Sequence, residues 1–254
     1  MTNLALFLNI FAFFFAVYLV VAGAAYAATW WLGRERYLHR RIQQNPRPAQ
    51  VGREIFWSAI SIMIISALLT VTWYAAGQGW IKSYLDINQY SLWWLAISVL
   101  VMALVHDSYY YWAHRGMHHP SVFRYVHKLH HGFTNPTPFA SYAFHPLEAV
   151  VEVAWFLPLA AVVPLHPLAV GIYIFVLTVL NVISHLGYEF YRPGVGQWFI
   201  TSTHHNMHHS RAKGHFMLYF NFWDKWMGTN ATDYTSQLQR VAEARRAAKE
   251  QSPA

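Results

Sequence analysis

The sequence predicts an all-α integral membrane protein, a bundle of four or five membrane segments with a histidine-rich cap at one end. Two observations support this prediction. Of the 254 residues, 56% are hydrophobic and only 11% are charged, whereas soluble domains usually carry about 25% charged residues. Fifteen of the 16 histidines fall between His106 and His215, so imidazoles are concentrated in one part of an otherwise apolar chain.

The first half of the chain contains three apolar segments of membrane length. A spanning helix needs about 20 apolar residues. Residues 3–32 and 55–76 each supply them, and a third segment runs from 91 to about 105 and continues into the first histidines. The arginine-rich loop (residues 33–54) joins the first two segments, and a nearly neutral connection, residues 77–90, joins the next two. Excess Lys and Arg marks cytoplasmic loops, so we expect the histidines on the cytoplasmic side.

A further apolar stretch, residues 149–184, is long enough for a hairpin. It contains Pro158, Pro164 and Pro167, and we expect the chain to turn near Pro164–Pro167 and return to the cytoplasmic side. All the histidine clusters would then share one face of the membrane. The first segment could also be a signal peptide, but no Lys or Arg precedes Arg34, so the charged leader region is missing.

The composition excludes several classes of function. The chain has no cysteine, which removes disulfides, Fe–S clusters and thiolate nucleophiles. Its net charge of +7 does not indicate a nucleic-acid partner, because the basic residues form no recognition helix and no aromatic–basic platform. Membrane topology accounts for the charge instead.

The histidines form three boxes whose spacing is suited to binding metal ions. The boxes are His114-Arg-Gly-Met-His118, His127-Lys-Leu-His130-His131 and His205-Asn-Met-His208-His209. Residues four apart share one face of a helix, so His114 and His118 can bind one ion. Adjacent histidines diverge by about 100° around a helix, so an HxxHH box divides its histidines between two ions. The set therefore predicts a dinuclear site.

The chemistry of the ligands narrows the choice of metal. Imidazole ligation without thiolate suits iron, copper, nickel or zinc. Nearby carboxylates commonly orient such imidazoles through their second nitrogen, and we expect Glu148, Glu189 and Asp224 in this role.

From Val105 to Thr229 the chain resembles the fatty acid hydroxylase/sterol desaturase superfamily. The resemblance rests on the three boxes, on Thr137-Pro-Phe-Ala-Ser-Tyr-Ala-Phe-His145-Pro-Leu-Glu148 and on Phe222-Trp-Asp-Lys-Trp-Met-Gly-Thr229. The stretch Pro138–Glu148 is most similar to the sterol C5-desaturase branch. The resemblance implies a diiron centre that uses O2 and two electrons to oxidise an unactivated C–H bond of a lipid. We divide the chain into three parts: N-terminal membrane helices and a basic loop in 1–90, a fatty acid hydroxylase-like catalytic domain with the membrane hairpin in 91–234, and a charged tail in 235–254.

The resemblance also implies a set of metal ligands. They are His114, His118, His127, His130, His131, His145, His185, His205, His208 and His209. His185 matches a ligand position of the family's hydroxylases, which carry a second histidine four residues later, where this chain has Glu189. Either His145 takes that position or Glu189 coordinates directly, and we favour His145.

Six histidines remain outside this set. We expect His39 and His166 to be solvated, and we assign no role to His215. His106 could be a ligand or an outer contact. His119 and His204 adjoin box members, and we expect them to form hydrogen bonds rather than to coordinate.

The sequence thus predicts O2-dependent hydroxylation or desaturation of a membrane lipid at two iron ions. Electrons would come from another protein, a cytochrome b5-like carrier or a ferredoxin with its reductase, which the basic cytoplasmic surface could dock. Two alternatives stay open. A zinc hydrolase would need only three ligands and usually carries HExxH, which is absent. A metal transporter would place its ligands within spanning helices.

Overall fold

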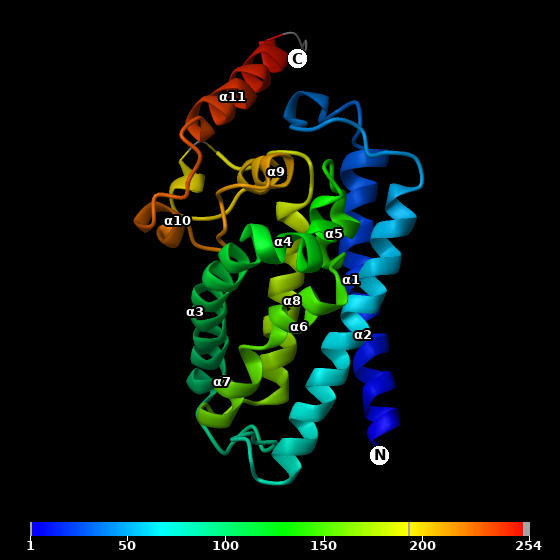
Figure 1. Ribbon diagram of the computed structural model, residues 1–254, viewed down its shortest axis with the longest axis vertical. Coiled ribbons are helices and arrows are strands. Elements are labelled where there is room, and N and C mark those ends of the chain that lie inside the picture. The colour runs from blue at the N-terminus through cyan, green and yellow to red at the C-terminus, as the bar shows by residue number, and fades with distance from the viewer. Residues whose placement is uncertain (1, 193, 251–254) are drawn as a thin grey trace.

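The computed structural model describes residues 2–192 and 194–250, and these residues form helices and loops without a β-strand. Four helices in these ranges are long and apolar enough to cross a membrane (Figure 1). They are α1 (Asn3–Tyr26, continued by η1, Ala27–Trp31), α2 (Gln50–Gly77), α3 (Leu92–Met117) and α8 (Pro167–Ser184). The predicted all-α membrane bundle is confirmed.

Helices α1 and α2 pack side by side and hold an irregular segment against the bundle. Phe14, Tyr18 and Ala22, spaced four residues apart on α1, are buried, and the Tyr18 hydroxyl donates to the carbonyl of Phe139 at 2.8 Å. Small polar residues of α2 face the same segment, and Ser58 Oγ donates to the Phe139 carbonyl at 2.9 Å. This segment contains η3 (Pro138–Tyr142) and leads directly from the second histidine box to α6.

The apolar stretch 149–184 forms a hairpin with unequal arms. Its descending arm consists of two short helices, α6 (Pro146–Val153) and α7 (Phe156–Val162), and its ascending arm is α8. Pro158 explains the break, because it lacks the N–H that would bond the carbonyl of residue 154 in a continuous helix. The chain turns just before Pro167, as predicted. There Leu165 N donates to the Lys82 carbonyl at 2.9 Å, so this turn and the 77–90 connection lie at the same end of the bundle.

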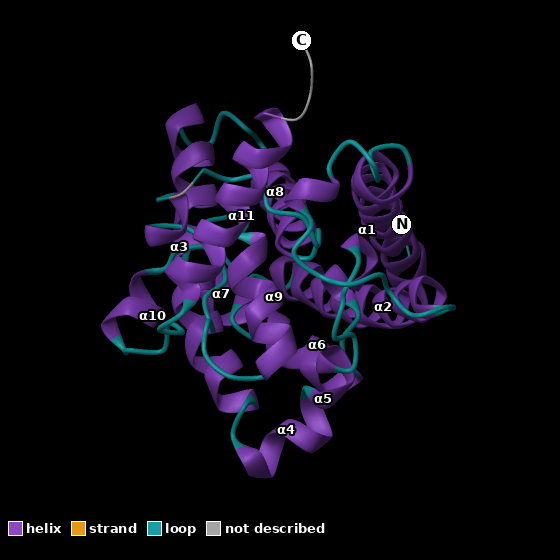
Figure 2. Ribbon diagram, turned by 90° about the horizontal axis from the view of Figure 1, so that it is seen from above, coloured by secondary structure: helices purple, strands orange, loops and turns teal. Residues whose placement is uncertain are grey.

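The opposite end carries a cap of short helices. These are α4 (Pro120–Val126), α5 (Lys128–His131), α9 (Ser202–Arg211) and α10 (Phe222–Trp226), with η2 (Leu38–Arg40) and η4 (Val195–Gln197) in the loops and α11 (Tyr234–Glu250) outermost (Figures 1 and 2). The arginine-rich loop joins this cap, since Gln43 donates to the Pro136 carbonyl and accepts from Asn206, both at 2.7 Å. The loop and the histidine boxes therefore lie at one end, as predicted. The predicted tail 235–254 is helical as far as Glu250, and 251–254 fall outside the described residues.

Candidate metal centre

Nine histidines converge where the cap meets the bundle. They form two groups, and within each group the nearest ring nitrogens all lie within 4.8 Å of one another. The five-histidine group consists of His114, His118, His127, His131 and His208, and the four-histidine group of His130, His185, His205 and His209. These histidines lie on or next to α3, α5, α9 and the end of α8, so the centre joins the membrane helices to the cap.

The two HxxHH boxes are divided between the groups in the way helix geometry predicts. His127 and His131, four residues apart, belong to the five-histidine group, while His130 between them belongs to the other. On α9 the pattern is reversed, because His205 and His209 share the four-histidine group and His208 joins the other. Each box thus contributes to both groups, and the groups lie beside each other.

The spacing of the ring nitrogens is that of neighbouring ligands on one ion. The Nε2 atoms of His114 and His127 are 3.0 Å apart, as are those of His131 and His208. In the four-histidine group, His205 Nε2 lies 2.9 Å from His185 Nε2 and 3.0 Å from His209 Nε2. With metal–nitrogen bonds of about 2.1 Å, two ligands at right angles would be about 3.0 Å apart. The arrangement therefore fits a metal ion in each group.

Most of these imidazoles are oriented through their other nitrogen, Nδ1. Backbone carbonyls serve five of them, at distances from 2.7 to 3.3 Å: the pairs are His114–Phe216, His118–Ala212, His130–Ala143, His185–Asn181 and His208–Gly214. A hydrogen bond of this kind places the proton on Nδ1 and leaves the Nε2 lone pair free for a metal. His118 Nε2 is buried and has no hydrogen-bond partner, which also fits coordination.

Burial keeps the rings in the form that binds metal. It lowers the pKa of His118 and of His185 to about 4. Burial likewise lowers the pKa values of His127, His130, His205, His208 and His209 well below the usual range, and neighbouring histidines add to the effect. These imidazoles are therefore neutral at pH 7, as metal coordination requires.

Three buried carboxylates support the centre, but only Glu148 touches one of the nine histidines. Its Oε1 accepts from His127 Nδ1 at 2.7 Å. Asp224 accepts from the backbone N–H groups of Phe216 and Met217 at 3.0 and 2.7 Å. It thereby fixes the loop whose carbonyls orient His114 and His208. The direct role expected for Asp224 and Glu189 is thus replaced by an indirect one.

Glu189 supports the start of α9. Its Oε2 accepts from the backbone N–H and the hydroxyl of Thr203, at 3.1 and 2.7 Å, and its Oε1 from Tyr191 N at 2.9 Å. Thr203 lies in the first turn of α9, where N–H groups have no partner within the helix. A carboxylate engaged in this way positions the helix and does not join either histidine group.

His145 also lies apart from the other nine histidines of the expected set. It is the residue before α6, and its Nδ1 accepts from Leu147 N at 3.3 Å. The structure therefore brings neither His145 nor Glu189 into the position that the family's extra histidine would take. The four-histidine group is formed without His145 and without Glu189.

The remaining histidines have other contacts. His106 Nδ1 is 2.5 Å from the Tyr173 hydroxyl, and His119 is exposed, with its Nδ1 2.7 Å from Ser121 Oγ. The His204 side chain takes part in the N-terminal cap of α9 and stacks on Tyr234. It forms no hydrogen bond with a histidine of the boxes. The carbonyls of 212–216 that orient imidazoles of the five-histidine group could not be predicted from sequence, because any residue type supplies a carbonyl.

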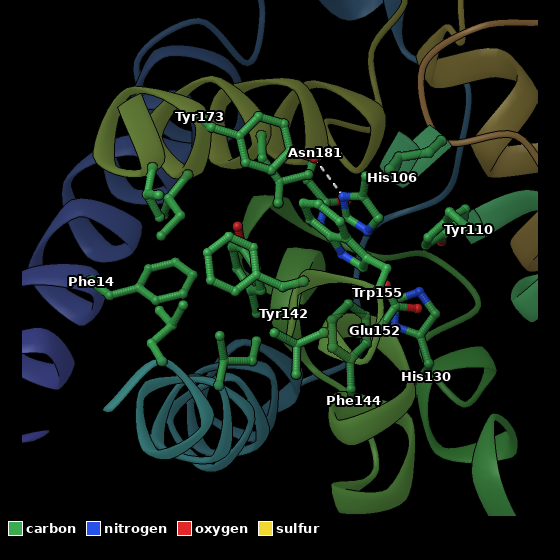
Figure 3. A pocket seen from close by; sticks show the side chains of 18 of the residues that line it. Phe14, His106, Tyr110, His130, Tyr142, Phe144, Glu152, Trp155, Tyr173 and Asn181 are labelled. Atoms are coloured by element: carbon green, nitrogen blue, oxygen red, sulfur yellow. Dashed lines mark hydrogen bonds between the residues drawn. The ribbon is translucent and has the colours of Figure 1, made fainter. Parts of the chain in front are cut away.

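An apolar cavity extends from the four-histidine group into the bundle (Figure 3). His130 and His185 form part of its wall, and Phe14, Leu69 and Ile174 are among the apolar side chains that line it. These last three also line a second apolar groove between α1, α2 and α8, toward the end away from the cap. The two hollows therefore adjoin, with these side chains between them.

A polar groove lies on the cap beside the five-histidine group. It is lined by His118, by Arg115 and Lys213, and by the ion pair of Arg211 and Asp233. His118 is the partly exposed member of the nine, and the other eight are buried. This groove is therefore where the centre comes closest to the aqueous surface of the cap.

A family model and curated relatives identify the proteins to which this chain is similar. The fatty acid hydroxylase family model matches residues 99–229. The Delta(7)-sterol 5(6)-desaturase ERG3B of Gibberella zeae is 33% identical over 197 residues, covering 75% of this chain and 60% of that protein. Lathosterol oxidase of Rattus norvegicus is 34% identical over 184 residues, with coverages of 71% and 61%. The chain thus spans about three fifths of the length of these curated relatives. No solved structure matches the chain significantly.

Proposed function

Because the chain belongs to the fatty acid hydroxylase family, we propose that it catalyses the O2-dependent hydroxylation or desaturation of a membrane lipid at a histidine-ligated diiron centre. The observation that carries this proposal is the pair of histidine groups, whose convergent, neutral imidazoles suit two ions. Iron bound there would supply the redox chemistry that O2-dependent C–H oxidation requires. The nine histidines are the proposed ligands.

The balance of the reaction defines what the rest of the protein must provide. Hydroxylation of a C–H bond consumes O2, two electrons and two protons and yields one alcohol and one water. Desaturation consumes the same reagents and yields one C=C bond and two waters. The chain must therefore hold a lipid near the centre, keep bulk water away from it and receive electrons from another molecule.

The apolar cavity is the proposed substrate site. It reaches His130 and His185 and adjoins the groove between α1, α2 and α8, so a lipid can enter from the bilayer without crossing water. Its apolar wall excludes bulk water from the reacting carbon. The names of the relatives, a sterol 5(6)-desaturase and a lathosterol oxidase, favour a sterol or a related cyclic lipid as substrate.

Electrons reach the centre from the opposite side. The groove on the cap exposes His118 among basic residues, so an acidic one-electron carrier is the proposed donor. We place the cap on the cytoplasmic face, because the arginine-rich loop lies at this end and the nearly neutral 77–90 connection at the other.

Counting iron per chain tests the proposal. Protein purified in detergent from iron-supplemented cells should contain about two iron ions, one for each histidine group. His208→Ala removes a ligand of the five-histidine group and His209→Ala one of the four-histidine group, and each variant should retain about one iron. His145→Ala is the matched control and should retain both, because His145 lies outside the groups.

Lipid products provide the second readout. Iron-loaded protein supplied with O2, a reductant and membrane lipids should yield a lipid that has gained one oxygen atom or lost two hydrogen atoms, measured by mass spectrometry. One zinc and no iron, even after anaerobic reconstitution with Fe(II), would refute the oxygenase and point to hydrolysis or metal handling.

A further inference from the structure

Glu152 carries a carboxyl group that has no partner among the described residues. It lies on α6, one turn after Glu148, and it lines the apolar cavity together with His130 and His185 (Figure 3). The Glu148 carboxylate binds His127. The Glu152 side chain forms no hydrogen bond or ion pair with any residue in the ranges that the structure describes.

Three other polar side chains of the cavity wall have partners, whereas the Tyr110 hydroxyl, like Glu152, forms no hydrogen bond with a described residue. The Tyr142 hydroxyl is 2.9 Å from Thr178 Oγ1, and the Tyr173 hydroxyl is 3.0 Å from the Tyr219 hydroxyl. Asn181 Nδ2 donates to the Ser141 carbonyl at 2.6 Å. Glu152 thus differs from Tyr142, Tyr173 and Asn181, because its hydrogen-bonding capacity is left for whatever fills the cavity.

An unpaired carboxyl group in apolar surroundings is unfavourable, and a charged one is more unfavourable than a neutral one. Polar groups that are retained at such sites within membrane proteins usually have a function. A ligand that brings a hydroxyl group to Glu152 would remove this penalty, and a ligand without one would not.

We propose that Glu152 binds a hydroxyl group of the substrate, so that the cavity selects a lipid alcohol over the corresponding hydrocarbon. This inference rests on the proposed function, since it assigns the cavity to the substrate. The carboxyl group accepts a hydrogen bond from a hydroxyl in either protonation state. Four residues, about 6 Å along the helix axis, separate Glu152 from Glu148, which contacts His127. The hydroxyl is therefore held near the centre, and the oxidised carbon lies in the same part of the lipid.

Equilibrium binding of matched lipid pairs tests this assignment without turnover. The full-length protein in lipid nanodiscs is titrated with cholestanol and 5α-cholestane, and with hexadecanol and hexadecane. Wild type should bind the alcohol of at least one pair about tenfold more tightly than its hydrocarbon. Glu152→Leu should abolish this preference by lowering the affinity for the alcohol. Glu152→Gln keeps a hydrogen-bond acceptor and should retain most of the preference.

Two controls separate recognition from folding. Leu177→Ala changes an apolar residue of the same cavity and should lower the affinity for the alcohol and for the hydrocarbon by the same factor. Without ligand, Glu152→Leu should leave the unfolding temperature unchanged or raise it, whereas Glu148→Leu, which breaks the bond to His127, should lower it. A preference that survives in Glu152→Leu, or a wild type that binds no alcohol more tightly than its hydrocarbon, overturns the inference. Lipid oxidation by iron-loaded protein is scored separately, so the two proposals can fail independently.

Discussion

Glu148 shows at the residue scale how a single side chain can orient a proposed metal ligand, His127. Most of the nine histidines are oriented by backbone carbonyls, which substitution does not remove. His127 is oriented instead by the Glu148 carboxylate, at 2.7 Å and without exposure to solvent. The carboxylate fixes the orientation of the ring and makes its Nε2 a better electron-pair donor to a metal ion. The contribution of Glu148 to metal binding can therefore be measured by mutation.

Glu148→Gln should weaken iron binding at the five-histidine group by about 10–100-fold. The amide keeps the shape of the side chain but loses the negative charge that favours the metal-bound imidazole. Anaerobic titration with Fe(II) should show one weakened site and one unchanged site per chain. Glu35→Gln, an exposed change in the arginine-rich loop, is the control and should bind like wild type. Two unchanged sites in Glu148→Gln would show that the contact does not tune the metal.

The histidines that precede proline show what sequence could and could not predict at this scale. His119, His145 and His166 each precede a proline at the start of a helix, and the side chains of His145 and His166 accept a capping hydrogen bond there. Proline at the first position of a helix is a recognised start signal. It could have identified His145 as a capping residue, whereas the family pattern pointed to coordination. The division of the HxxHH boxes was predictable because it depends only on helix geometry.

At the element scale, α9 depends on its N-terminus. This helix carries His205, His208 and His209, yet few of its side chains are apolar, so hydrophobic packing alone does not hold it. Thr201 caps the helix, and Glu189 binds Thr203 in its first turn. The role of Glu189 could not be predicted from sequence, because it depends on how the loop after α8 folds back onto a helix that begins 13 residues later.

Glu189→Ala should lower the free energy of unfolding by about 1–3 kcal/mol, because two donors of Thr203 lose a buried acceptor. Glu189→Gln should destabilise less, since it retains one acceptor oxygen. Thermal unfolding followed by circular dichroism measures both effects. Iron content supplies the discriminating readout. If Glu189 positions α9, Glu189→Gln keeps about two iron ions per chain, and the loss of one iron without loss of stability would mean that Glu189 coordinates directly.

The hairpin shows why element boundaries were harder to predict than the bundle itself. Hydropathy located its apolar residues and the prolines located its turn, and both agree with the structure. The descending arm, however, is divided into α6 and α7. That division brings Glu148 to the histidines and Glu152 to the cavity. Hydropathy cannot predict this arrangement, because it depends on tertiary contacts rather than on composition.

At the scale of the whole molecule, the two histidine groups face different surroundings. The four-histidine group borders the apolar cavity through His130 and His185. The five-histidine group approaches the polar groove of the cap through His118. Since His127, His130 and His131 are close in sequence yet serve both groups, the two ions would be neighbours. Under the proposed function, this arrangement would let an apolar substrate reach the centre through the cavity and a water-soluble reductant through the groove.

Reversing one charge in the groove should slow electron delivery from an acidic carrier. Lys213 is exposed beside His118, and Lys213→Glu should reduce the rate of oxidation of a reduced acidic [2Fe–2S] ferredoxin by about three- to tenfold at low salt. The wild-type rate should fall as salt is added, and the variant should show a weaker dependence, because screening removes an attraction that it lacks. Stopped-flow absorbance of the ferredoxin, with iron-loaded protein in nanodiscs, measures both rates.

Lys82→Glu makes the same change at the opposite end of the bundle and should behave like wild type. Equal slowing by both variants would mean that net charge acts rather than the groove, and no slowing by Lys213→Glu would place the docking surface elsewhere.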